Sequence, residues 1–132
     1  MATLPVILCV DDEVVVLNSL KRQLKNEFND RYLYEIAENA IEALELIEEL
    51  QEDELDVIVI VSDWLMPGIK GDEFLVQVHQ KFPKVVKILL TGQADDGAIE
   101  RAKQHAGLHK CLPKPWSEQE LVETIKSGLA ML

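Results

Sequence analysis

Five side chains suited to binding a metal ion and a phosphoryl group follow apolar runs in this sequence. Each stands at the carboxyl end of such a run, in the order Asp11, Asp12, Asp63, Thr91 and Lys114. Carboxylate oxygens are the ligands that hard divalent cations such as Mg²⁺ prefer in proteins. A hydroxyl group and an ammonium group can both donate hydrogen bonds to phosphoryl oxygens. The set is therefore suited to holding a divalent metal and a phosphoryl group, provided that the fold brings it together.

The apolar runs predict the strands of a parallel sheet. Runs that are apolar throughout, and that alternate with helical patterns, are typical of strands covered by helices on both faces. We expect five strands, at residues 5–10, 32–37, 57–63, 85–90 and 110–113.

Five helices are expected to alternate with these strands. Their predicted ranges are 13–28, 40–52, 71–82, 94–106 and 117–129, and their apolar residues recur at helical spacing. Asn39 with Glu42, and Ser117 with Glu120, are spaced as capping pairs that begin a helix. Pro83 is expected to end the third helix, because proline cannot continue the hydrogen-bond ladder.

The predicted fold class is α/β, a three-layer (βα)5 sandwich around a flavodoxin-like parallel sheet of order 2-1-3-4-5. The second strand carries Glu35 and the fifth contains Pro113, and both features suit edge strands. In such sheets ligands bind beyond the carboxyl ends of the strands, where the strand order reverses. The first and third strands are neighbours in this order, so Asp11, Asp12 and Asp63 are expected to meet there.

Length and composition fit a single domain over residues 1–132 that acts without nucleic acid or membrane. The chain is 48% apolar with a net charge of -11, and phosphate contacts need a basic surface instead. No stretch reaches the ~18 apolar residues that a membrane span requires. The first residues lack the pattern of an export signal, and Cys9 and Cys111 make no disulfide framework, so a cytoplasmic location is expected.

The sequence resembles the receiver domains of bacterial two-component response regulators. The resemblance runs from Val6 to about Leu129 and rests on four motifs that occur in order. These are Asp11-Asp12, the stretch Asp63-Trp64-Leu65-Met66-Pro67 with Gly71, Thr91-Gly92, and Lys114-Pro115. The family is a class of phosphorylation-dependent signalling modules, so the resemblance implies a phosphoacceptor and not an enzyme with an independent substrate.

The resemblance also implies a role for each matched side chain. Asp63 would accept a phosphoryl group from a sensor histidine kinase or a histidine phosphotransfer protein. Thr91 would donate its hydroxyl to a phosphoryl oxygen, and Lys114 would offset the remaining charge. The implied Mg²⁺ ligands are Asp12, Asp63 and the backbone carbonyl of Leu65, with Asp11 acting directly or through water.

One position departs from the family pattern. Receivers usually carry Tyr or Phe three residues before the paired lysine, as a ring that turns inward on activation, whereas this chain has Cys111. Activation is therefore expected to depend on the loop after Thr91 and on the fourth helix. The resemblance implies a cis bond between Lys114 and Pro115, and an output or homodimer face formed by the fourth helix, fifth strand and fifth helix.

Two alternatives bear on function. A haloacid-dehalogenase-type Mg²⁺ phosphatase needs Asp-x-Asp after its first strand, whereas this chain has Asp11-Asp12-Glu13 and no room for a cap domain. A receiver that works without phosphorylation would lack an acidic ligand, Thr91 or Lys114, and none is missing. The sequence leaves open whether the chain is a stand-alone regulator or the receiver of a longer protein with its own output.

Overall fold

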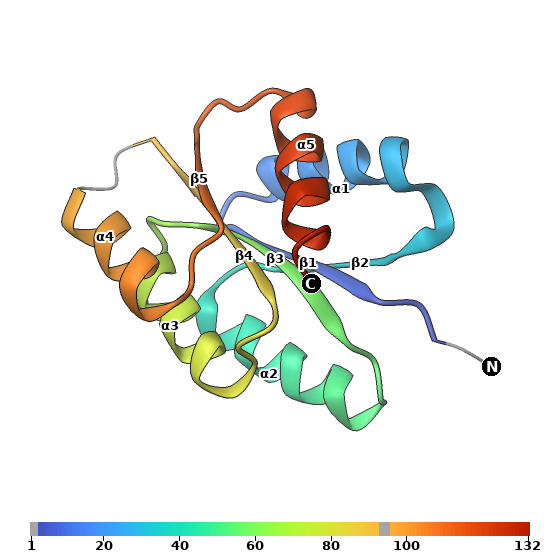
Figure 1. The fold of residues 1–132 in the computed structure, drawn as a ribbon, viewed down its shortest axis with the longest axis horizontal. Helices are drawn as coiled ribbons and strands as arrows, with labels where there is room; N and C mark the ends of the chain where they lie inside the picture. Colours follow the sequence, from blue (N-terminus) through green and yellow to red (C-terminus); the bar gives the residue numbers. More distant parts are fainter. Residues whose placement is uncertain (1–2, 93–95) are drawn as a thin grey trace.

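Five parallel strands form one sheet in the order β2-β1-β3-β4-β5 in the computed structural model, which describes residues 3–92 and 96–132 (Figure 1). The order and the edge positions of β2 and β5 confirm the prediction. The strands are β1 Val6–Val10, β2 Leu33–Ala37, β3 Val57–Asp63, β4 Val86–Thr91 and β5 Lys110–Pro113.

The helices lie close to their predicted ranges. They are α1 Val14–Phe28, α2 Ala40–Glu52, α3 Gly71–Lys81, α4 Asp96–His105 and α5 Glu118–Leu129, with a short 3-10 turn at Asn29–Arg31. The predicted start of the fourth helix at Ala94 lies outside the described residues. The two capping pairs are confirmed, because Asn39 Oδ1 accepts from the Glu42 N–H at 2.8 Å and Ser117 Oγ accepts from the Glu120 N–H at 3.0 Å.

Helices cover both faces of the sheet, as the uniformly apolar strands require. Helices α1 and α5 lie on one face, and α2, α3 and α4 lie on the other (Figure 1). Alternate residues of each central strand therefore enter two separate cores. Ile7 and Cys9 of β1 pack under α1 and α5, whereas Leu8 and Val10 face the other three helices. Burial of this apolar surface is the main stabilising contribution to the fold.

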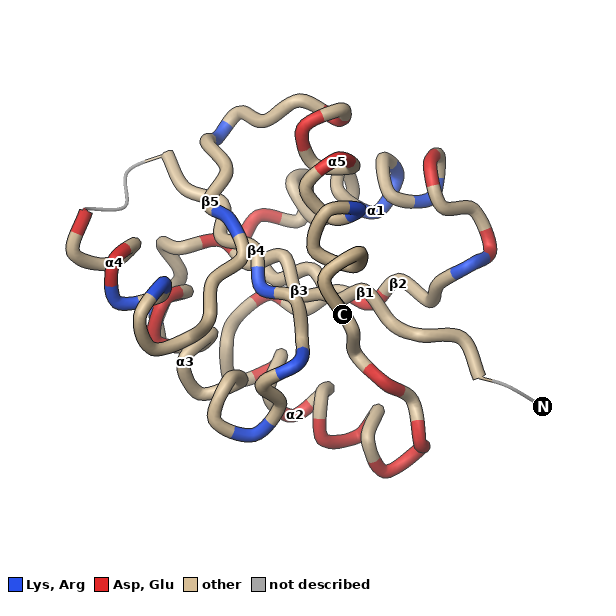
Figure 2. The backbone as a smooth tube through the Cα atoms, viewed as in Figure 1, with Lys and Arg blue, Asp and Glu red and all other residues tan. Residues whose placement is uncertain are grey.

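Much of the acidic charge lies away from the strand ends that carry the candidate site. Glutamates and aspartates gather on α2 and on the turn that leads to β3 (Figure 2). This turn lies at the end of the sheet where the strands begin. The basic residues are spread more widely, over α1, β4, α4, β5 and several other helices and turns (Figure 2). None of the helices in the described part of the chain has the length and apolar character that a membrane-spanning helix needs.

Candidate functional site

Backbone hydrogen bonds extend the sheet beyond its strands and fix the candidate residues. The Asp11 N–H donates to the Ala37 carbonyl at 3.1 Å, and the Lys114 N–H donates to the Thr91 carbonyl at 3.1 Å. Trp64, directly after Asp63, donates its N–H to the carbonyl of Leu90 at 3.0 Å. The side chains that follow the strands are therefore held by the sheet itself.

The Lys114 ammonium group lies between two buried carboxylates. Its Nζ is 2.7 Å from Asp11 Oδ2 and 3.0 Å from Asp63 Oδ1. The peptide bond between Lys114 and Pro115 is cis, as the resemblance implied. The other oxygen of Asp11 accepts from the backbone N–H of Glu13 at 2.8 Å, so this buried side chain has partners on both sides. Charge-assisted hydrogen bonds of this length are among the stronger ones in proteins.

Three carboxylates come together beyond the carboxyl ends of β1 and β3, as predicted. One oxygen from each of Asp11, Asp12 and Asp63 lies within 4.8 Å of the other two, a spacing that could hold a metal ion. Asp11 and Asp63 are buried, whereas Asp12 is exposed. The oxygens are hard donors of the kind that Mg²⁺ takes. The residues present therefore fit a divalent cation that remains accessible from solvent.

Burial and neighbouring charges together shift two pKa values in this cluster. Burial raises the pKa of the Asp63 carboxyl, and repulsion from Asp11 and Asp12 adds to that effect, while Lys114 opposes it. Burial alone would lower the pKa of the Lys114 ammonium, but its hydrogen bonds to Asp11 and Asp63 outweigh burial and raise it. Lys114 is thus held firmly charged beside a carboxylate whose negative charge is poorly compensated.

A cavity of about 540 Å³ opens beside Asp63 and is lined by both polar and apolar residues. Thr91 and Lys114 form part of its wall, together with Trp64 and Leu65. The predicted acceptor, hydroxyl and ammonium thus share one open space. Coordination by the Leu65 carbonyl stays a prediction, although Leu65 itself lines the cavity.

Gly71 allows the loop after Asp63 to close tightly. Its N–H donates to the Trp64 carbonyl at 2.8 Å, and a Cβ added at Gly71 would collide with the backbone carbonyl of Asp63. Any larger residue would have to push this loop away from helix α3. The glycine in the motif is therefore required by the close approach of two backbone segments.

A network around Asp72 was not predicted from the sequence. This buried carboxylate accepts from the Trp64 indole at 3.0 Å and from Arg101 Nη2 at 3.1 Å. Asp72 stands in the first turn of α3, where an acidic residue has the ordinary role of complementing the helix dipole. No clear indication of this contact exists in the sequence, because Asp72 and Arg101 are 29 residues apart and share no pattern.

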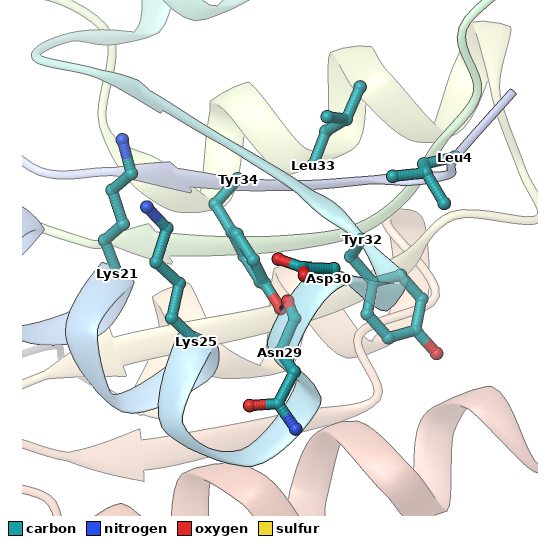
Figure 3. Close-up of a pocket in the computed structure, with 8 residues that line it drawn as sticks. All are labelled: Leu4, Lys21, Lys25, Asn29, Asp30, Tyr32, Leu33 and Tyr34. Atoms are coloured by element: carbon teal, nitrogen blue, oxygen red, sulfur yellow. Dashed lines mark hydrogen bonds between the residues drawn. The ribbon is translucent and has the colours of Figure 1, made fainter.

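A second cavity, of about 480 Å³, lies between α1 and the edge strand β2 and has a different chemistry. Lys21 and Lys25 run side by side along one wall, and the Tyr34 ring lies between them and Asp30 (Figure 3). The Tyr34 hydroxyl is already used, since it donates to the Asn29 carbonyl at 2.7 Å. This cavity does not contain the three-carboxylate cluster and is remote from Asp63.

The fold and the site together match a known class of signalling domain. The sequence model of the response regulator receiver domain family matches residues 7–126. The chain therefore belongs to the response regulator receiver domain family, as its motifs indicated.

Solved structures of receiver domains superpose closely on this chain. The signal receiver domain of an HD domain-containing protein from Pseudomonas fluorescens Pf-5 has a TM-score of 0.86 and 30% identity, covering 98% of this chain and 97% of that one. A CheY-like receiver domain protein from Methanospirillum hungatei JF-1 has a TM-score of 0.85 and 32% identity, with 98% and 96% covered.

Curated relatives carry this domain within longer proteins. The hydrogenase transcriptional regulatory protein HoxA of Cupriavidus necator is 32% identical over 123 residues, which are 93% of this chain and 24% of that protein. The response regulator MprA of Mycobacterium leprae is 36% identical over 124 residues, which are 93% and 50% of the two proteins. The chain thus spans about a quarter to a half of the length of these relatives.

Proposed function

We propose that residues 1–132 act as one receiver domain in the cytoplasm and that Asp63 accepts a phosphoryl group from a phosphohistidine. A carboxylate oxygen of Asp63 attacks the phosphorus, the bond from phosphorus to the imidazole nitrogen breaks, and an aspartyl phosphate forms. One observation carries this proposal: the Lys114 ammonium lies 3.0 Å from Asp63 and 2.7 Å from Asp11, beside an open cavity. A fixed positive charge is thus in place where phosphoryl charge would arrive.

The acidic cluster supports a divalent cation, which we propose to be Mg²⁺. Asp11, Asp12, Asp63 and the Leu65 carbonyl would hold it. When bound, Mg²⁺ neutralises charge on the phosphoryl oxygens and orients them for in-line transfer. The need for a cation is strong here, because burial and two neighbouring carboxylates already disfavour the charged form of Asp63.

The remaining polar groups would position and stabilise the incoming group. The Thr91 hydroxyl would donate to one phosphoryl oxygen. The Lys114 ammonium would donate to a second phosphoryl oxygen in addition to the carboxylates. Phosphoryl transfer needs little besides positioning and charge stabilisation. In this proposal the domain has no further substrate of its own and serves as a phosphoacceptor.

Apolar residues around the cavity support a protein donor. Val14 and Val15 begin α1 and are 51% and 77% exposed, and Leu65 in the cavity wall is 54% exposed. Because Asp63 is only 5% exposed, a donor histidine must be pressed into the opening to reach it. A sensor histidine kinase or histidine phosphotransfer protein that covers these apolar side chains would supply that contact, and burial of apolar surface would stabilise the complex.

We propose that the phosphorylated state is read at the face formed by α4, β5 and α5, where the domain can also form a homodimer. Thr91 ends β4, and β4 pairs with β5 through Leu89 and Cys111. Cys111 supplies no ring that could turn inward, so a movement of α4 must carry the change. The Cys111→Tyr variant tests this, since a ring that is dispensable should leave the activation-induced hydrogen exchange of α4 unchanged.

The central experiment is phosphorylation by acetyl phosphate, read as intact mass. The native chain is expected to gain one phosphoryl group in the presence of Mg²⁺ and none in EDTA. Asp63→Asn keeps the size of the side chain and removes the nucleophile, so it should gain none under either condition. Beryllofluoride, which mimics a phosphoryl group, should bind the native chain and not the variant. Labelling of the Asn variant would place the acceptor elsewhere and overturn the proposal.

A further inference from the structure

A buried carboxylate links the end of strand β3 to helix α4. The Asp72 side chain is 2% exposed, and each of its oxygens has a different partner. Oδ1 accepts from Trp64 Nε1 at 3.0 Å, while Oδ2 accepts from Arg101 Nε at 3.2 Å and Nη2 at 3.1 Å. We call Trp64, Asp72 and Arg101 the Asp72 bridge.

One end of the bridge belongs to the proposed acceptor site. Trp64 directly follows Asp63 and lines the same cavity. Its backbone is held by hydrogen bonds to Leu90 and Gly71, and its ring is covered by Lys70, whose Nζ lies 4.9 Å from the ring centroid. With Asp72 holding the indole N–H, this side chain has little freedom. The position of the Trp64 ring in the cavity wall next to Asp63 therefore depends on the position of the Asp72 carboxylate.

The other end of the bridge belongs to helix α4. Arg101 lies in the middle of α4 (Asp96–His105), and its side chain is 59% exposed. It makes a two-nitrogen contact with one carboxylate oxygen. Because the guanidinium is planar and rigid, this contact constrains the position of the helix relative to Asp72 more than a lysine would.

The two contacts depend on each other because they share one buried charge. Removing one partner of a buried ion pair leaves an uncompensated charge, which is costly. If α4 moves Arg101 away, Asp72 must find water or hold the indole more tightly, and the indole shifts with it. If Trp64 moves instead, the free energy of the Arg101 contact changes by the same amount, since coupling between two sites is reciprocal.

We propose that Asp72 is a positioning residue for the acceptor site, acting through Trp64, and that its bond to Arg101 couples the geometry at Asp63 to the position of α4. This inference rests on the proposed role of Asp63. It assigns the coupling to a charged contact on the α3 side of α4, separate from Thr91 and from the position occupied by Cys111. Phosphorylation rate and α4 position then report on each other.

A double-mutant cycle on the phosphorylation rate tests the coupling. The variants are Trp64→Phe, Arg101→Gln and the double variant, with acetyl phosphate as the donor and saturating Mg²⁺. Each single change is expected to slow phosphorylation by about threefold or more, because small misplacements at a reacting group are costly. Relative to the native chain, the double variant should be slowed by far less than the product of the two single-variant factors. The reason is that both changes act through Asp72.

Lys103→Gln is the matched control, because it removes the same charge from an exposed position on the same helix. Its rate should stay within about twofold of the native rate, which separates the bridge from general attraction of an anionic donor. Factors that multiply in the double variant would overturn the proposal. So would a Lys103→Gln variant as slow as Arg101→Gln.

Indole NMR signals provide a readout that needs no phosphoryl transfer. The chain has two tryptophans, and Trp116 Nε1 donates to Gln23 Oε1 at 2.8 Å, away from the bridge. Arg101→Gln is expected to shift the indole N–H signal of Trp64 and to leave that of Trp116 in place. Asp72→Asn, which keeps an acceptor for the indole, should shift the Trp64 signal and the Arg101 Nε signal together. An unmoved Trp64 signal in Arg101→Gln would overturn the bridge.

The two proposals fail in different ways. Phosphorylation of Asp63→Asn would remove Asp63 as the acceptor, while the indole shifts would still show whether Arg101 and Trp64 are coupled. Conversely, a native chain labelled only on Asp63, with rate factors that multiply, would keep the proposed function and overturn the bridge.

Discussion

Lys87 and Lys114 show how one sheet treats two lysines in opposite ways. Lys87 lies within β4 and is 1% exposed, and its ammonium donates to backbone carbonyls, with Val85 at 2.7 Å and Pro83 at 3.4 Å. Lys114 follows β5 and donates to the carboxylates of Asp11 and Asp63. Burial lowers the pKa of Lys87 from 10.5 to about 8, whereas the pKa of Lys114 is raised.

The difference lies in the partners and not in burial. Burial is the largest single influence on both lysines, and acting alone it would lower the pKa of each. Carbonyl groups satisfy the hydrogen bonds of Lys87 but bring no negative charge, so desolvation prevails. At Lys114 two carboxylates reverse the balance. A lysine is thus paired with carboxylates at the carboxyl ends of the strands, where phosphoryl chemistry is proposed. The lysine in the interior of the sheet has no such charged partner.

Removing the charge of Lys114 should have the largest effect in this comparison. Lys114→Gln is expected to slow phosphorylation by acetyl phosphate about 100-fold, the usual loss when one charge-stabilising group is deleted. Lys87→Met removes an equal charge from the same sheet and should change the rate less than about twofold. The rates are measured by intact mass over time. Equal losses in the two variants would mean that net charge, and not the location of Lys114, controls the reaction.

The pH dependence of stability should isolate Lys87. Its folded-state pKa of about 8 lies below the unfolded value near 10.5, so the unfolded chain binds more protons between these pH values. Lys87 should therefore contribute a rise in the free energy of unfolding with pH across that window. The raised pKa of Cys9 contributes in the opposite sense, so the Lys87 contribution is taken as the difference from a variant. Lys87→Met lacks this contribution, and the difference between the two curves should change by about 3 kcal/mol.

Urea denaturation at several pH values from 7.5 to 10.5 measures this difference. Lys84→Met is the matched control, because Lys84 is exposed in the same turn before β4. The control should follow the native curve. Parallel curves for the native chain and Lys87→Met would show that Lys87 keeps an ordinary pKa.

Repulsion at the Lys114 end should appear as a smaller gain in stability. In EDTA, Asp63→Asn is expected to raise the free energy of unfolding by less than the Lys87 effect, because it removes a carboxylate whose charge burial and two neighbours disfavour. The Asn side chain can still accept from Lys114. Urea denaturation at pH 7 checks the value. A destabilised variant would show that the ion pair with Lys114 outweighs the repulsion.

The smallest expected effect is optical. Mg²⁺ should change the fluorescence of Trp64, since the ring lies beside the cavity and follows Asp63 directly. Trp64→Phe leaves Trp116 as the reporter, and its metal response should be lost. Asp63→Asn should weaken the response of the native pair of tryptophans. A response retained in Trp64→Phe would assign the signal to the region of α5.

The sequence predicted the strand ends better than the interior contacts. Asp11, Asp63 and Lys114 were identified because each follows an apolar run, and parallel strands bring their carboxyl ends to one edge. Lys87 lies inside such a run, and nothing local shows that its ammonium folds back to the turn before β4. Its partners exist only once Pro83 and Val85 are placed by the end of α3.

The Asp72 bridge was beyond prediction for a related reason. Asp72 fits the acidic first turn of a helix, and Arg101 fits a solvated position on another, so neither residue type is unusual in its place. Their meeting depends on how closely α3 and α4 approach, which no periodicity encodes. The neighbouring Gly71 was part of a motif, yet its cause, the collision of any Cβ with the Asp63 carbonyl, is visible only in three dimensions.

The two thiols differ in a way that makes the domain convenient to label. Burial raises the pKa of Cys9 in β1 to about 12, and Asp11 adds to the effect, so this thiol has almost no reactive thiolate at neutral pH. Cys111 in β5 is only half-buried. Maleimide reagents should therefore modify the native chain once, at Cys111, and the urea-unfolded chain twice, as mass spectrometry would show. A spin label or fluorophore attached there would sit on the strand between α4 and α5, without any engineered cysteine.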